Sequence, residues 1–430
     1  MHYDCDVIIV GTGAAGLYCA LNLPPQLRVQ LLTKKKADES DSYLAQGGIC
    51  VLRGEEDYTD FFEDTLKAGH YENDRLAVDQ MIRSSGHVVT DLLARGVRFE
   101  REGDGSLAFT REGAHTRPRI LYHKDITGQE ITCSLLRDVW ALPNVTIREH
   151  VTMLDLLTDG KRCGGLIVST PQGELEVLRA PIVVLCCGGL GGLYTHTTNF
   201  SHITGDALAI AMKHDVEVEH LDYIQIHPTT LYTQQPGRSF LISESVRGEG
   251  ALLYNKNMER FTDELLPRDK LTQVIFQQME KDGTSYVWED MRPLGEDIIL
   301  SHFPNIYQHC LSKGINVLEE PIPVVPAQHY FMGGIKVNLS SQTSMKGLYA
   351  CGETSCNGVH GRNRLASNSL LESLVFARRA AEDITFGQSH VGGCPGLSPD
   401  LSAYGDMDAL FAGYRETLLT AIERTRDHHE

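Results

Sequence analysis

The sequence predicts an α/β fold: a Rossmann-like nucleotide-binding domain, interrupted by an inserted α+β capping domain and followed by a short, truncated C-terminal helical tail. Three observations predict it. The chain begins with a strand, a glycine-rich turn and a helix. A long stretch of different composition separates this start from a later strand that also enters a glycine turn. Finally, 430 residues are too many for one compact core.

The N-terminal unit comes first. Val7–Val10 is a short apolar run typical of a buried strand, a helical pattern later runs to Leu21, and Val29–Thr33 predicts a second strand at the spacing of a βαβ unit. Between the first strand and the helix stand Gly11, Thr12, Gly13, Ala14, Ala15 and Gly16. Glycines in such a turn let the backbone approach a pyrophosphate, and the helix N-terminus faces the phosphates. The unit therefore predicts a dinucleotide site.

The next part of the chain alternates helices and strands. Amphipathic patterns predict helices over 58–68, 75–94 and 128–140. A β-branched, alternating stretch over 151–177 predicts a small antiparallel sheet, and the apolar run 182–187 predicts a buried strand.

The remaining segments complete the division into domains. Residues 221–331 are rich in Arg, Glu, Asp and Pro and are interpreted as the capping domain; residues 1–220 and 332–388 form the discontinuous nucleotide-binding domain. The strand and turn at 347–353 and a helix over 369–384 belong to the latter. Residues 389–430 form the tail, with one helix over 407–424.

Composition excludes several classes of protein. The formal net charge of -18 is the wrong sign for a protein that grips nucleic acid over a broad face. Eleven cysteines without a CxxC pair indicate neither a disulfide framework nor a zinc ribbon, and they favour the reducing cytoplasm. The apolar run Ala180–Thr195 contains four glycines and is too short to span a membrane, so we expect no membrane association.

The dinucleotide is not fixed by the first turn alone. No acidic residue ends the second strand; Lys34, Lys35 and Lys36 follow Thr33 instead. Lysines here fit the extra phosphate of NADP, or FAD with Lys34 near the adenosine and Thr33 on the ribose, or a solvated basic loop. The second glycine turn, 347–353, and the helix start at 364–372 favour flavin, because a helix N-terminus stabilises the charge that a reduced flavin carries.

Several motifs together resemble one family. VIIVGTGAAG, SYLAQGGI, IQIHPTTL, SESVRGEGA, PRD, PAQHYFMGG, GLYACGE and HGRNRLASNSLLES occur in the order found in the flavoprotein family of succinate dehydrogenase, fumarate reductase and L-aspartate oxidase. The resemblance covers about residues 5–385. Within the family, the stretch Phe109–His115 followed by Arg119–Leu121 resembles the branch that oxidises L-aspartate.

The resemblance implies a set of substrate-binding residues. L-Aspartate has two carboxylates and one ammonium group, so its pocket needs two anion-binding groups and one anion. By resemblance, Arg364 and His329 hold one carboxylate. His227 and Ser243 hold the other. Arg268 lies over the reacting carbons, and Glu112 faces the ammonium group. A carboxylate at this place repels succinate or fumarate, so an enzyme that acts only on those dicarboxylates has no use for it.

The resemblance also implies a proton relay. Glu244 and Arg247, three residues apart, would pass a proton to Arg268. Because a guanidinium is a poor base, we favour orientation of the substrate as the role of Arg268. Taken without the family, these side chains have plainer interpretations: His227 and His329 as buried core histidines, Glu112 as an exposed loop charge, and Arg268 as an ion pair near a helix start.

By resemblance, FAD is bound non-covalently, because Asp41 stands where the family's flavin-linking histidine would be. The implied FAD contacts are Gly11, Thr12, Gly13, Ala14, Ala15, Gly16, Lys34, Ser42, Tyr43, Leu44, Ala45, Gln46, Gly47, Gly48, Asp206, Glu353, Ser369 and Leu370. A metal site at Cys351, Cys356 and His360 is a weaker idea, because the spacing fits no common zinc pattern, and we expect no metal.

The implied reaction is oxidation of L-aspartate to iminoaspartate, with oxygen or fumarate as electron acceptor, as the first step toward quinolinate and NAD. Quinolinate synthase is the implied partner, and we expect a monomer. Two alternatives stay open: a fumarate reductase that uses no amino acid, and a flavin-binding interaction protein without turnover.

Overall fold

The computed structural model describes residues 3–234, 237–387 and 397–429. The expected boundary between the nucleotide-binding domain and the tail, at 388–389, lies outside the described residues. No described helix is both long and apolar enough to cross a membrane.

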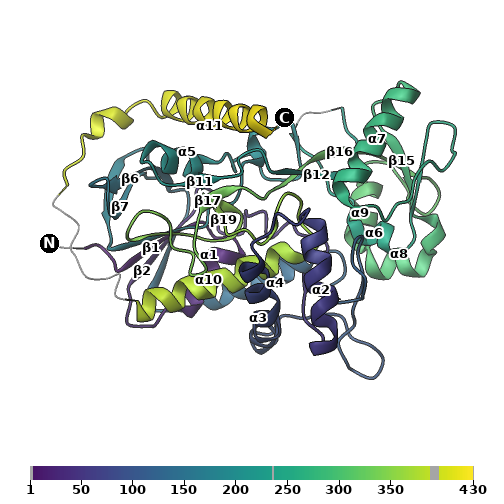
Figure 1. The fold of residues 1–430 in the computed structure, drawn as a ribbon, viewed down its shortest axis with the longest axis horizontal. Coiled ribbons are helices and arrows are strands. Elements are labelled where there is room, and N and C mark those ends of the chain that lie inside the picture. Colours follow the sequence, from purple (N-terminus) through teal and green to yellow (C-terminus); the bar gives the residue numbers. More distant parts are fainter. Residues whose placement is uncertain (1–2, 235–236, 388–396, 430) are drawn as a thin grey trace.

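A five-stranded parallel sheet forms the centre of the larger part of the molecule (Figure 1). Its strands pair in parallel throughout, and β1 pairs with both β2 and β9, as the predicted βαβ unit requires. The order across the sheet is β18 (Leu348–Ala350), β9 (Ile182–Leu185), β1 (Val7–Val10), β2 (Val29–Leu32) and β5 (Val145–Arg148). The Rossmann-like centre is therefore confirmed, although β2 and β9 end one and two residues earlier than predicted.

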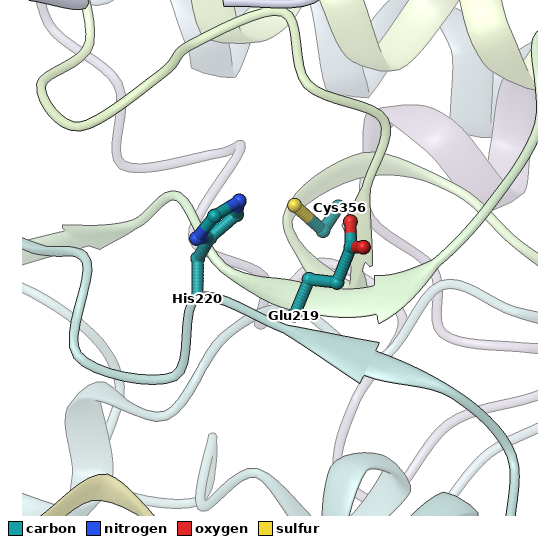
Figure 2. Close-up of side chains that lie close together, drawn as sticks. All are labelled: Glu219, His220 and Cys356. Carbon is teal, nitrogen blue, oxygen red and sulfur yellow. The ribbon is translucent and has the colours of Figure 1, made fainter. Parts of the chain in front are cut away.

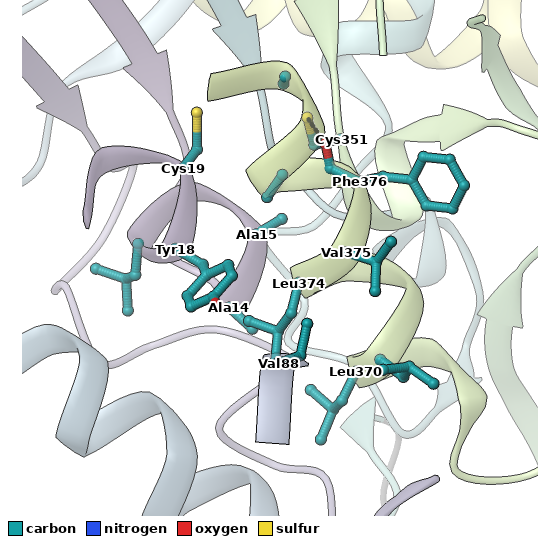
Figure 3. Packing of buried hydrophobic residues seen from close by; sticks show 14 of the residues in the cluster. Ala14, Ala15, Tyr18, Cys19, Val88, Cys351, Leu370, Leu374, Val375 and Phe376 are labelled. Atoms are coloured by element: carbon teal, nitrogen blue, oxygen red, sulfur yellow. Dashed lines mark hydrogen bonds between the residues drawn. The ribbon is translucent and has the colours of Figure 1, made fainter. Parts of the chain in front are cut away.

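Helices cover one face of this sheet. Helix α1 packs on α10, and α10 packs on α3 (Figure 3). Tyr18 of α1, Leu374 of α10 and Val88 of α3 are all buried in one apolar cluster. The bounds of the helices in this part are α1 (Ala14–Asn22), α2 (Glu55–Ala68), α3 (Arg75–Ala94), α4 (Thr127–Trp140) and α10 (Asn368–Phe386).

The opposite face carries the predicted antiparallel sheet together with two helices. The strands β6 (Thr152–Thr158), β7 (Cys163–Ser169) and β8 (Leu175–Arg179) form an antiparallel sheet, as expected. Helix α5 (Asp206–Lys213) packs under α11 (Met407–His429), which extends beyond the predicted end at 424. Figure 1 shows α11 lying along the molecule above α5.

A second group of elements lies at one end of the molecule, to the right in Figure 1. It has its own apolar core, formed among others by Leu231, Ile275 and Val324. Its sheet pairs β16 with β12, β15 and β10. The bounds are β10 (His196–Thr197), β12 (Ile224–Leu231), β13 (Gly237–Arg238), α6 (Glu244–Gly248), β14 (Leu252–Tyr254), α7 (Arg268–Asp282), β15 (Val287–Asp290), η2 (Arg292–Leu294), α8 (Glu296–His302), α9 (Pro304–Ser312) and β16 (Ile322–Phe331).

Several short elements complete the fold. Most of the second group falls within the range 221–331 assigned to the capping domain; β10 joins its sheet from outside that range, and the exact domain division stays a prediction. The short elements are β3 (Ile49–Cys50), β4 (Ile120–Leu121), η1 (Gly191–Leu193), β11 (Val218–Glu219), β17 (Gly334–Lys336), η3 (Gly352–Thr354), β19 (Ser355–Cys356) and η5 (Leu401–Tyr404).

Candidate active site

One cleft of about 420 Å³ runs from the β1–α1 turn to the second group of elements. It is lined by almost every predicted site residue. The exceptions are Gly16, which lies beneath the turn, and Arg247, which lies behind Glu244. The motifs that are far apart in the sequence therefore meet in one place.

The β1–α1 turn has the geometry that a pyrophosphate site needs. Gly11 has φ +112°, and a Cβ atom there would lie 2.0 Å from the carbonyl O of Cys186. A Cβ atom on Gly16 would lie 1.9 Å from the carbonyl O of Gly11. The N-cap residue of α1, Gly13, has no side chain, and Ser42 Oγ accepts a hydrogen bond from only the first helical residue, at the Ala14 backbone N, at 3.1 Å. The bare helix N-terminus faces the cleft and suits a phosphate.

Lys34 is held in place, whereas its neighbours are exposed. Its ammonium group pairs with the Asp206 carboxylate and lies 3.3 Å from Thr204 Oγ1. Lys35 and Lys36 are solvated, as the plainer interpretation expects. Lys34 is already paired with Asp206, so this lysine is not a free cation for the extra phosphate of NADP. Its pairing favours the FAD interpretation.

Two partly buried carboxyl groups, Asp41 and Glu353, line the part of the cleft where the flavin is predicted. Burial raises the pKa of Asp41 to about 7, although the Phe200 backbone N donates to its Oδ1 at 2.9 Å; its Oδ2 has no partner. Burial, and then the charge of Asp41, raise the pKa of Glu353 to about 8, against a hydrogen bond from the Phe331 backbone N. The buried Gln46 Oε1 is also without a partner. Such unsatisfied polar atoms fit a polar cofactor that the structure does not contain.

Two histidines and one arginine lie at the end of the cleft where anion binding is predicted. The rings of His227 and His329 lie 5.1 Å apart, and Thr198 Oγ1 lies 2.7 Å from His329 Nδ1. Burial and nearby arginines hold the pKa of both imidazoles well below the ordinary range, so both are neutral at pH 7. His227 Nε2 and Arg364 Nε are buried without partners. These atoms are available to a ligand.

Arg364 keeps its charge despite complete burial. Burial, followed by the charge of Arg268, lowers its pKa to about 10, which still leaves it protonated at pH 7. Its Nη1 donates to Ser369 Oγ at 2.9 Å, and its guanidinium lies 4.4 Å from the centre of the Tyr330 ring. Ser243, the fourth predicted anion contact, caps α6 and lines the cleft.

Arg268 is the first residue of α7 and forms a buried ion pair. Its Nε donates to Glu244 Oε2 at 2.6 Å, and its Nη1 donates to Gln225 Oε1 at 2.8 Å. The plainer interpretation expected an ion pair near the helix start; the partner is Glu244 from another helix, and the adjacent Asp269 pairs instead with His70. Gln225 was not among the predicted residues, because a single glutamine in the strand motif IQIHPTTL carries no signal.

Glu112 is buried, so its interpretation as an exposed loop charge is wrong. Its Oε1 accepts from Ser245 Oγ at 2.8 Å and its Oε2 accepts from Ser367 Oγ at 2.5 Å. Burial, and then the charge of Glu244, raise its pKa above the ordinary value. A Cβ atom at Gly47 would lie 2.6 Å from Glu112 Oε1, so a larger residue there would displace the Glu112 carboxylate.

Arg247 continues the line of charges away from the cleft. Burial acts to raise the pKa of Glu244, but the charges of Arg268 and then of Arg247 hold this pKa below its ordinary value. On its other side, Arg247 Nε lies 3.9 Å from Glu289 Oε1. Both oxygens of Glu289 are buried without hydrogen-bond partners in the described structure, and burial raises its pKa to about 8. Glu289 was missed, since nothing in the sequence marks it as buried.

The stretch 109–121 owes its shape to a buried ion cluster. Arg119 is fully buried and donates to Asp57 at 2.9 Å and to Asp64 at 2.7 Å. It also contacts His115, whose Nε2 lies 3.1 Å from the Ala366 carbonyl O. This cluster ties the loop that carries Glu112 to α2 and to the segment before α10.

The metal idea at Cys351, Cys356 and His360 is wrong. Cys351 lies with Cys186 and Cys19 in the apolar core, and His360 packs edge-on against Tyr330. The side chain of Cys356 instead lies near Glu219 and His220.

A parallel βαβ unit with an uncapped, glycine-lined phosphate turn and a cleft of buried ionisable groups defines a flavin-dependent oxidoreductase. The chain matches the family described as FAD binding domain over residues 6–370. It is 49% identical to the L-aspartate oxidase of Clostridium perfringens, covering 89% of this chain and 87% of that protein, and 46% identical to that of Clostridium acetobutylicum, covering 91% and 90%. The chain therefore belongs to the FAD-binding flavoprotein family, in the group of the L-aspartate oxidases.

Solved structures agree with this assignment. A quinol fumarate reductase from E. coli superposes with a TM-score of 0.83 at 31% identity, covering 96% of this chain and 74% of that one. Sdh1 of Mycobacterium smegmatis in complex with UQ1 superposes with a TM-score of 0.79 at 28% identity, covering 94% of this chain and 72% of that one.

Proposed function

We propose that this protein catalyses the FAD-dependent oxidation of L-aspartate to iminoaspartate, with oxygen or fumarate as the electron acceptor. One observation carries the proposal beyond the family: Glu112 is a buried carboxylate of the cleft whose two oxygens accept from serine hydroxyls, whereas the neighbouring buried carboxylate, Glu244, is paired with Arg268. A dicarboxylate without an amine gains nothing from such a group, whereas an amino dicarboxylate does.

The two carboxylates of the substrate bind at the anion-binding end. Arg364 and His329 hold one, with Arg364 Nε free to donate. His227 and Ser243 hold the other, with His227 Nε2 free. Since both histidines are neutral, the positive charge at this end comes from Arg364, and the attraction is local rather than a property of the acidic chain.

Glu112 faces the ammonium group and takes a proton from it. A hydride leaves a carbon more readily when the adjacent nitrogen has a free lone pair, so the substrate amine must lose a proton first. The raised pKa of Glu112 is closer to the pKa of the ammonium group than that of an ordinary carboxyl group, which favours transfer of the proton. Ser245 and Ser367 fix the carboxylate so that it points at one position.

When bound, FAD would accept the hydride from the Cα of the substrate and would pass the electrons to oxygen, giving hydrogen peroxide, or to fumarate, giving succinate. The glycine turn and α1 would hold its pyrophosphate, Lys34 and Asp206 would lie on the adenosine side, and Asp41, Glu353, the loop 42–48, Ser369 and Leu370, which all line the cleft, would contact the rest. Asp41 stands where the flavin-linking histidine would be, so FAD would bind without a covalent bond to the protein.

Arg268 orients the reacting carbons. Glu244 and Gln225 fix two of its nitrogens, so the guanidinium presents the remaining edge to the cleft. In fumarate reduction the proton path would run through Glu244 and Arg247. Residues 221–331 act as the cap that closes over the substrate. The proposal also holds that the protein is a monomer, lies in the cytoplasm and passes iminoaspartate to quinolinate synthase.

The alternative is a fumarate reductase that uses no amino acid, favoured by the similarity to the quinol fumarate reductase fold. The flavin spectrum under anaerobic conditions separates the two. L-Aspartate, D-aspartate, L-glutamate and succinate are added in turn to the FAD-loaded enzyme. Bleaching by L-aspartate alone supports the proposal; bleaching by succinate alone supports the alternative, and no bleaching by any of them indicates a protein without turnover.

A further inference from the structure

A second group of chemically reactive side chains lies outside the cleft, on the small sheet formed by β11, β17 and β19 (Figure 2). Glu219 ends β11, His220 follows it, and Cys356 ends β19. One ligand atom from each of the three lies within 4.8 Å of the others. Among the described residues, no other group of His, Cys, Asp and Glu side chains meets this condition.

We propose that Glu219, His220 and Cys356 bind a divalent cation of borderline softness, Zn²⁺. Thiolate, imidazole and carboxylate are the ligands that this ion prefers, and three protein ligands leave a fourth, open position for water. Glu219 and His220 are partly exposed, so both water and the ion can reach the site. None of the three residues lines the cleft, which makes the site independent of substrate and FAD.

The backbone fixes the positions of these ligands. Glu219 pairs with Gly334 in the antiparallel ladder of β11 and β17, and Lys336 pairs with Cys356 in the parallel ladder of β17 and β19. His220 has φ 55°, a left-handed conformation, and its ring stacks on Tyr223 with centroids 4.4 Å apart. A ligand set that is built into a sheet needs little rearrangement when the ion binds.

Cys356 must lose a proton to act as a ligand. Binding of Zn²⁺ displaces the thiol proton to solvent and forms the metal–sulfur bond, so the charge of the ion replaces the charge of the proton.

Lys336 is the counter-ion of the metal-free site. Its Nζ lies 2.8 Å from Glu219 Oε1 and 3.5 Å from Glu217 Oε2. When the metal takes Glu219, Lys336 keeps Glu217 as a partner. Lys336 and the metal therefore compete for the same carboxylate, and removal of the lysine charge must strengthen metal binding.

The test uses the FAD-loaded enzyme after treatment with a chelator. Zn²⁺ is titrated in competition with a chromophoric indicator, and Co²⁺ is titrated to detect a thiolate-to-metal absorption band. We expect one equivalent of bound metal, an affinity that rises with pH, and a loss of about tenfold or more in affinity for Cys356→Ser and His220→Gln. Lys336→Met should bind more tightly than the wild type.

The exposed Cys133 provides the matched control. Cys133→Ser should bind Zn²⁺ like the wild type, whereas loss of binding in this variant would assign the metal to a surface thiol and overturn the proposal. Absence of a bound equivalent in the wild type, or equal affinity in the wild type and His220→Gln, would also overturn it. Because His220 is partly exposed, that variant decides the matter even if Cys356→Ser fails to fold.

Discussion

Arg268 and Gln225 are joined by a hydrogen bond of 2.8 Å between Nη1 and Oε1, and both side chains are buried. Gln225 also donates from Nε2 to the carbonyl O of Arg364 at 2.8 Å. One neutral side chain of strand β12 thus contacts two arginines of the cleft and sets the position of one against the other.

Substitution of Gln225 should therefore change catalysis more than stability. In Gln225→Leu, Arg268 keeps only Glu244, and we expect kcat to fall by about 10- to 100-fold as the guanidinium loses its orientation. Gln225→Glu retains an acceptor for Arg268 and should recover part of the loss. Steady-state kinetics and an anaerobic substrate titration measure both. Equal losses in the two variants would show that the contact to Arg364 matters instead.

Glu112→Gln should separate two activities of the same cleft. An amide cannot accept the ammonium proton, so we expect L-aspartate oxidation to fall by about 100-fold or more. Fumarate reduction by the pre-reduced enzyme should stay largely intact, because fumarate has no amine. Glu249→Gln, at a glutamate that pairs with His302 outside the cleft, serves as the control and should change neither rate. Equal loss of both activities in Glu112→Gln contradicts the role given to Glu112.

Glu353 should make stability decrease as the pH rises from acidic to neutral. Its pKa of about 8 in the folded chain is above the value of about 4.3 in an unfolded chain. Its neutral form therefore contributes stability that is complete below the unfolded value, decreases between the two values and is lost once the pH has risen through about 8. We expect Tm and FAD retention to decrease between about pH 5 and 8, and to decrease less in Glu353→Gln. Parallel pH profiles for the two proteins would exclude this group as the cause.

Gly16→Ala should prevent formation of the phosphate turn. The new methyl group would lie 1.9 Å from the Gly11 carbonyl O, a contact that requires the backbone to move. We expect loss of FAD binding, measured by flavin absorbance after gel filtration. Gly86→Ala, in the exposed middle of α3 with no atom within 4 Å of the added Cβ, is the matched control. It should bind FAD normally and raise stability by about 0.5–1 kcal/mol.

The sequence predicted the parts of the fold that rest on local chemistry. The turn at Gly11–Gly16 has a spacing dictated by steric contact, and the helices 75–94 and 128–140 follow their apolar periodicity, so both appear within a residue of the predicted bounds. The strand ends were less well predicted, because Thr33 and Cys186 are as apolar or β-branched as the residues that pair before them. Thr33 N also still donates to the Arg148 carbonyl O at 3.0 Å and Cys186 N to the Val10 carbonyl O at 2.7 Å, so the inter-strand hydrogen bonds continue past the last residue of each strand.

The site was predictable where a motif carries a residue and not where tertiary contact alone defines it. Arg364, His329 and Glu353 lie in recognisable segments. Gln225 and Glu289 become functional neighbours only through distant contacts, to Arg268 and Arg247 respectively. The burial of Glu112 depends on Ser367, 255 residues away, and no local pattern signals such a contact.

The last helix of the described chain reaches the cofactor end of the molecule. Phe411 of α11 places its ring 5.1 Å from Lys34 Nζ, and Tyr414 donates to the carbonyl O of Leu154 at 2.8 Å. Lys34 in turn pairs with Asp206, the first residue of α5 beneath this helix. If Lys34 faces the adenosine side of FAD as proposed, undocking of α11 would loosen this lysine, and we expect the lifetime of bound flavin to follow hydrogen exchange in α11.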